Sequence, residues 1–122
     1  MTNAEFQALW QDAQSAKDRE VFASDWALSS VFAGDVPESL IDSEKSNSDA
    51  LRLYEDLSHL WNAANLPFRD LLAEFRLSQS DLARRFAIPL RTVQNWAAGT
   101  PCPSYLRLMM AESLQYVDLR DR

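Results

Sequence analysis

The chain has 122 residues, of which 47% are hydrophobic, and it carries a formal net charge of −6. This length fits one domain or one domain with an appendage, and the hydrophobic fraction excludes a disordered chain. The sequence lacks an apolar run of about 18 residues and the pattern of a signal peptide, and it holds one cysteine, so we expect a cytoplasmic protein with no membrane partner.

The first 65 residues predict three helices. Thr2 and Glu5 form a capping-box pair at the start of a helix over 2–15, whose apolar stripe is Phe6, Leu9, Trp10 and Ala13. A second helix is expected over 18–32, ended by residues 34–37, and residues 37–41 fit one helical turn. Residues 42–49 contain no apolar side chain and predict a loop, after which Asn47 or Ser48 caps a helix over 49–64. The apolar residues assigned to these last two helices include Val21, Leu28 and Leu51.

Four further helices are expected, over 68–75, 79–86, 90–98 and 104–117. Ser78 is a suitable N-cap for the helix over 79–86, and Asp81 can complete a variant of the capping box. Pro89 suits the first turn of the next helix, and Gly99 suits a left-handed C-cap at its end. The last helix is assigned an inward face of Leu106, Met109, Met110, Leu114 and Val117, and residues 118–122 are expected to fray.

The charge is unevenly distributed along the chain. Residues 1–65 hold twelve acidic and four basic residues, whereas residues 66–110 hold six arginines and three acidic residues. The arginines of this basic island are Arg69, Arg76, Arg84, Arg85, Arg91 and Arg107. Arginine suits bidentate contacts with phosphate, so the acidity of the whole chain does not exclude a nucleic-acid partner for this segment.

The segments over 79–86 and 90–98 form a helix-turn-helix pattern. The first has Leu82, Ala83 and Phe86 on one face, and the second points Val93 and Trp96 inward, so we expect Trp96 to be a core residue. The outer face of the second helix carries side chains that suit phosphates and base edges, namely Arg91, Thr92, Gln94 and Asn95. The alternative is a helical hairpin that is packed for stability alone.

Residues 68–114 resemble the Cro-and-repressor class of helix-turn-helix proteins, also called the xenobiotic-response-element family. The matches at the family's spacing are Leu77-Ser78-Gln79, Leu82-Ala83, Phe86, Ile88, Thr92-Val93, Trp96 and Gly99. The sequence departs from the family pattern at three positions. Ala87 occupies a position that is usually glycine, Leu72 one that is usually arginine, and Ala97 one that is often glutamate. The sequence also lacks the basic residues that often follow the glycine at position 99.

This resemblance implies a compact helical bundle that binds duplex DNA, often as a homodimer, with the second motif helix in the major groove. It implies a DNA contact by Gln79 at the start of the first motif helix. It places Leu90, Arg91, Thr92, Gln94 and Asn95 at groove-facing positions. For Arg84 and Arg85, phosphate contact and simple solvation stay open as alternatives.

Other chemistry has little support in the sequence. His59 has Glu55 at helical spacing and is expected to make a surface hydrogen bond, and Cys102 lies between two prolines as a passive thiol. We therefore expect no enzymatic activity, no metal site and no cofactor.

These observations predict an all-α protein with three parts: an acidic helical N-terminal extension (1–47), a repressor-like helix-turn-helix domain (48–117) and a frayed tail (118–122). The expected function is sequence-specific binding of double-stranded DNA by a homodimeric transcriptional regulator, with repression as its output and activation as the alternative. The alternative is a protein-interaction module on the same scaffold, whose acidic N-terminal half binds a protein partner. The aromatic residues of the extension are expected to form core, or to contribute to a dimer interface.

Overall fold

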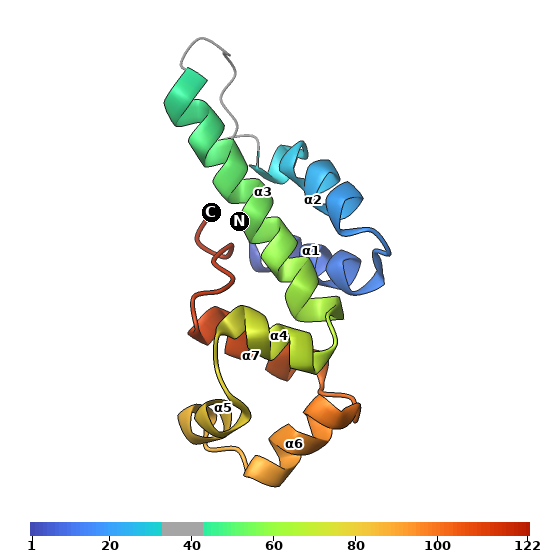
Figure 1. The fold of residues 1–122 in the computed structure, drawn as a ribbon. Coiled ribbons are helices and arrows are strands. Elements are labelled where there is room, and N and C mark those ends of the chain that lie inside the picture. Colours follow the sequence, from blue (N-terminus) through green and yellow to red (C-terminus); the bar gives the residue numbers. More distant parts are fainter. Residues whose placement is uncertain (33–42) are drawn as a thin grey trace.

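The computed structural model describes residues 1–32 and 43–122, and within them it contains helices and no strand. The helices are α1 (Asn3–Ser15), α2 (Arg19–Ala27), the 3-10 helix η1 (Ser30–Phe32), α3 (Ser43–Asn65), α4 (Phe68–Phe75), α5 (Gln79–Phe86), α6 (Leu90–Ala98) and α7 (Ser104–Ser113). The prediction of an all-α fold is confirmed. Figure 1 shows α1 and α2 against α3 at one end of the molecule, α5 and α6 at the other end, and α4 and α7 between them.

Three helix starts follow from local side-chain chemistry. The Thr2 hydroxyl accepts a hydrogen bond from the Glu5 amide while the Glu5 carboxylate accepts one from the Thr2 amide, as the capping-box prediction requires. The carboxylate of Asp18 accepts from the Val21 amide, and the hydroxyl of Ser78 accepts from the Asp81 amide. Each cap satisfies an amide that has no partner within its own helix.

Several helices end in a residue with positive φ. Arg76, Ala87 and Gln115 have φ of 57°, 53° and 59°, and Gly99 has φ of 122°. At each of these ends, the amide of the following residue donates to the carbonyl five positions earlier, as from Ile88 to Ala83 at 2.9 Å. This bond terminates the helix and satisfies a carbonyl of its last turn. The end at Gly99 is the one that the sequence predicted.

Helix α3 contradicts the loop predicted over 42–49. It begins at Ser43 and continues for 23 residues, so Asn47 and Ser48 lie inside the helix and do not cap it. The segment contains neither glycine nor proline, and adding residues to an existing helix costs little once its nucleus has formed. The turn predicted over 37–41 and the helix end predicted over 34–37 lie outside the described residues.

Two hydrophobic clusters form the interior. The first joins α1, α2, η1 and α3 to α7 and the segment after it, through Phe6, Leu9, Phe22, Phe32, Leu53, Leu57, Leu60, Leu108, Val117 and Leu119. The second joins α4, α5, α6 and α7 through Phe68, Leu72, Leu82, Val93, Trp96 and Met110. Helix α7 belongs to both clusters, since Leu108 packs in the first and Met110 in the second.

Some apolar residues that were assigned to buried faces point outward. Val21, Leu28, Leu51 and Met109 are 56%, 82%, 69% and 60% exposed. The helix predicted over 18–32 ends at Ala27, which removes Leu28 from its inward stripe. The helix predicted to reach residue 117 ends at Ser113, before the left-handed Gln115 redirects the chain.

The prediction that residues 118–122 fray is wrong. Leu119 is fully buried in the first cluster. Arg120 forms two hydrogen bonds with the Glu112 carboxylate and lies over the Phe6 ring at 4.0 Å from its centroid. Arg122 pairs with Asp56 of α3 at 2.8 Å. The buried leucine anchors the tail, and a lone apolar residue in a charged segment has no periodicity that would indicate burial.

Candidate nucleic-acid interface

Helices α5 and α6 are joined by a turn made of residues 87–89. Ala87 adopts the left-handed conformation, with φ 53° and ψ 41°. The helix-turn-helix family that this segment resembles usually has glycine at this position. Pro89 precedes α6, and its carbonyl accepts from the amides of Thr92 and Val93 at 2.9 and 3.3 Å. An exposed alanine therefore makes the sharp turn at a conformational cost that glycine would not carry.

The inner faces of both helices pack in the second cluster. Leu82 and Val93 are fully buried, and Trp96 is 8% exposed. The indole of Trp96 lies edge-on to the Phe68 ring, with centroids 5.3 Å apart and an interplanar angle of 65°. The prediction that Trp96 is a core residue is confirmed, and its burial fixes which side of α6 faces outward.

The outer face of α6 carries the side chains that were predicted to contact DNA. Arg91, Gln94 and Asn95 are exposed, and Thr92 is partly buried. The spacing i, i+3 and i+4 places the first three on one face of the helix. No acidic residue occurs in α6. This face offers a guanidinium and two amides, the groups that can bind purine edges in the major groove.

The remaining predicted contacts lie on α5. Gln79 is its first residue and is partly buried. Arg84 pairs with Asp81 at 2.6 Å, and hydrogen bonding with Ser78, followed by this pair, lowers the pKa of Asp81. The guanidinium of Arg85 lies 6.0 Å from the centroid of the neighbouring Phe86 ring. Arg84 thus has its charge partly compensated, whereas Arg85 forms no ion pair with the described residues.

One member of the basic island is not available on this surface. Arg107 of α7 is partly buried, and its Nε donates to the carbonyl of Ala63 at 2.6 Å while Nη2 donates to that of Leu66. These carbonyls lie at the end of α3, where a cation is favoured by the helix dipole. The sequence offered one signal for this role, because Arg107 stands alone between two leucines of an otherwise apolar run.

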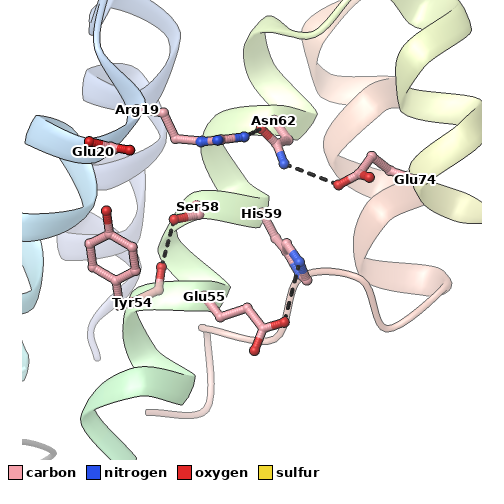
Figure 2. Close-up of a pocket in the computed structure, with 8 residues that line it drawn as sticks. All are labelled: Arg19, Glu20, Tyr54, Glu55, Ser58, His59, Asn62 and Glu74. Atoms are coloured by element: carbon pink, nitrogen blue, oxygen red, sulfur yellow. Dashed lines mark hydrogen bonds and ion pairs between the residues drawn. The ribbon is translucent and has the colours of Figure 1, made fainter.

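A second polar site lies between the two ends of the molecule. A pocket of about 290 Å³ is lined by residues of α2, α3 and α4, and Figure 2 shows Asn62 between Arg19 and Glu74. Asn62 is 3% exposed; its oxygen accepts from Arg19 at 3.1 Å, and its nitrogen donates to Glu74 at 3.3 Å and to the Tyr116 hydroxyl at 2.9 Å. The Tyr116 hydroxyl in turn donates to Glu74 at 2.7 Å.

This network connects α2, α3, α4 and the segment after α7 through side-chain hydrogen bonds. Burial raises the pKa of the Tyr116 phenol. His59 stacks on the Tyr116 ring with centroids 4.0 Å apart, and its Nδ1 lies 2.9 Å from the Tyr116 carbonyl oxygen. Figure 2 shows His59 beside Glu55, whose carboxylate lies 4.0 Å from the His59 Nε2. The described residues contain no cluster of three or more potential metal ligands. Sequence reasoning missed Asn62, since a single asparagine on a helix carries no pattern.

Comparison with known proteins yields no family model, no curated protein and no solved structure that matches this chain. Among the described helices, none is both long and apolar enough to cross a membrane.

Proposed function

We propose that this protein is a sequence-specific DNA-binding regulator of the helix-turn-helix type, in which α6 enters the major groove. The observation that carries the proposal is the division of α6 into a buried side, with Val93 and Trp96, and an acid-free outer side. The outer side holds Arg91, Gln94 and Asn95. A face that served stability alone would have no need to exclude carboxylates, whereas a face beside phosphates would.

The roles of the contacts follow from their positions. Gln94 and Asn95 are suited to hydrogen-bond adenine or guanine edges, and Arg91, in the first turn of α6, can reach either a guanine or the backbone. Gln79 and Arg85 contact the phosphate backbone of the DNA from α5. Arg84 contributes less, because Asp81 already holds its guanidinium.

The length of α6 favours a pair of protomers. Nine residues span about 13.5 Å, which corresponds to roughly four base pairs of duplex. So short a site would recur very often in any genome. Two copies that place their α6 helices about 34 Å apart would double the sequence that is read. Bound in this way at a promoter, the protein would act as a repressor by excluding other proteins.

A salt titration with mixed-sequence duplex DNA tests the proposal. Two to four phosphate contacts per protomer predict that the logarithm of the binding constant falls with the logarithm of salt concentration. The slope should be about −2 to −4 for a single bound protomer and about −4 to −7 for a bound pair. Absence of binding at low salt would refute the DNA-binding proposal and favour the protein-interaction alternative.

Base reading is tested on a duplex selected from a random pool. Gln94→Ala combined with Asn95→Ala should weaken binding to the selected duplex by about tenfold or more, and binding to random DNA far less. A matched control is Gln7→Ala with Gln11→Ala, which removes two exposed amides from α1. Equal losses on both duplexes would show that Gln94 and Asn95 do not read bases.

A further inference from the structure

A hollow of about 460 Å³ lies beside the C-terminal end of α6. We name it the α4–α6 hollow, because the start of α4 and the end of α6 with the residues after it form most of its wall. Exposed Pro67 supplies apolar surface, as do the small accessible parts of Phe68 and Trp96, which are 5% and 8% exposed, and Arg69 and Arg107 supply guanidinium groups. The hollow is distinct from the outer face of α6, since Trp96 belongs to the opposite side of that helix.

The charges around the hollow are of one sign. None of the described residues that line it is acidic. Neither Arg69 nor Arg107 forms an ion pair with any described residue. Arg107 is partly buried and is compensated by two carbonyl groups alone, and burial lowers its pKa. A partly buried cation without a carboxylate partner is a favourable site for an anion from solution.

We propose that the α4–α6 hollow binds a small organic anion, a carboxylate or phosphate ester with an apolar body. The two guanidinium groups hold the anionic head, and the body lies against Pro67 and the accessible parts of Phe68 and Trp96, a combination of apolar and charged groups typical of small-molecule sites. A phosphate of the DNA backbone would use the cations but leave the apolar wall exposed, so we assign the hollow to a small molecule. This assignment does not depend on DNA binding.

Phenyl phosphate is the probe for a first test on the full chain, read by shifts of backbone amide and indole resonances in NMR spectra. We expect saturable shifts at Phe68, Arg69, Thr100 and the Trp96 indole. Inorganic phosphate should bind about tenfold more weakly, the factor expected when roughly 60 Å² of apolar surface is no longer covered. Benzylamine, which has the same ring and the opposite charge, should give no shifts at these positions. Equal shifts with benzylamine, or none with phenyl phosphate, would overturn the proposal.

Two matched variants distinguish specific binding in the hollow from non-specific electrostatic attraction of the anion to the protein. Arg69→Gln should weaken phenyl phosphate binding about tenfold, the loss expected for a charge-assisted contact. Arg76→Gln removes the same charge from an exposed residue at the other end of α4 and should change binding by less than about twofold at physiological salt. Equal weakening by both variants would refute the site.

A competition experiment with duplex DNA distinguishes a small organic anion from a DNA backbone phosphate as the ligand of the hollow. If phenyl phosphate stays bound when duplex DNA is added in excess, the hollow is a small-molecule site. Displacement of the probe by DNA, together with weaker DNA binding of Arg69→Gln, would assign the hollow to a backbone phosphate and overturn the proposal. Should the chain bind no DNA, the phenyl phosphate titration still decides the question.

Discussion

The left-handed alanine between α5 and α6 gives a quantitative prediction. Ala87 has φ 53° and its side chain is exposed, so Ala87→Gly removes conformational strain without removing a buried contact. The left-handed region costs a residue with a Cβ about 1–2 kcal/mol. Glycine loses more entropy on folding, by about 0.5–1 kcal/mol. The expected net stabilisation is about 0.5–1 kcal/mol.

This gain should appear as a rise in melting temperature. At about 2.1 cal/mol/K per residue, a chain of 122 residues has an unfolding entropy of roughly 0.26 kcal/mol/K. A stabilisation of about 0.5–1 kcal/mol then raises Tm by about 2–4 °C, measured by circular dichroism at 222 nm.

The matched control is the same substitution in an ordinary helical position. Ala73 is exposed in α4, and Ala73→Gly should cost about 1 kcal/mol because glycine is a poor helix former. The two variants should therefore shift Tm in opposite directions. A fall in Tm for both would show that Ala87 is not strained and that the turn does not require a left-handed residue.

Three further predictions concern the interior. Leu119→Ala should lower the free energy of unfolding by about 2–5 kcal/mol in urea denaturation, because Leu119 is fully buried. The control Leu28→Ala, at a position that is 82% exposed, should lower it by less than about 0.5 kcal/mol. Similar values for the two variants would mean that the tail is not anchored. Asn62→Ala should cost about 1–3 kcal/mol by the same assay, since it leaves partners of a buried network unsatisfied, and a cost below about 0.5 kcal/mol would show the network to be dispensable. Burial raises the pKa of the Cys102 thiol to about 11, so the thiol of the unfolded chain loses its proton at a lower pH than the thiol of the folded chain. The free energy of unfolding should therefore fall as pH rises from about 9 to 11, and a Cys102→Ala variant should lack the contribution of this thiol to the fall. Identical pH profiles for the two proteins would contradict the raised pKa.

The sequence predicted those features that depend on neighbours along the chain. Caps at Thr2 and Ser78, the end of α6 at Gly99 and the inward direction of Val93 and Trp96 all rest on spacings of a few residues. The same reasoning placed Arg91, Gln94 and Asn95 outside, and the structure agrees. That these side chains bind DNA remains a proposal.

The features that the sequence did not predict depend on distant neighbours. Asn62 is buried because α2, α4 and Tyr116 converge on it, and Arg107 is withdrawn from the basic island because α3 ends beside it. Leu119 is buried in the cluster that α1, α2, η1 and α3 form with α7 and Val117. The partners of Asn62 and Arg107 lie more than ten residues away along the chain, so the neighbouring residues do not specify them. The wall of the α4–α6 hollow likewise comes from separate segments, 65–69, 96–102 and Arg107, and could not be predicted from the sequence.

The membership of α7 in both hydrophobic clusters has a consequence for genetics, because it joins the N-terminal helices to α5 and α6. The residues that complete the core around Leu57 and Leu60 come from α1 and α2, which belong to the segment that composition set apart as an extension. A screen for loss of the DNA binding proposed for α6 should therefore return substitutions such as Phe6→Ala in α1 or Phe22→Ala in α2, two helices at the opposite end of the molecule (Figure 1). Such alleles would act through the abundance of folded protein, would be relieved at low temperature, and would define no second binding surface.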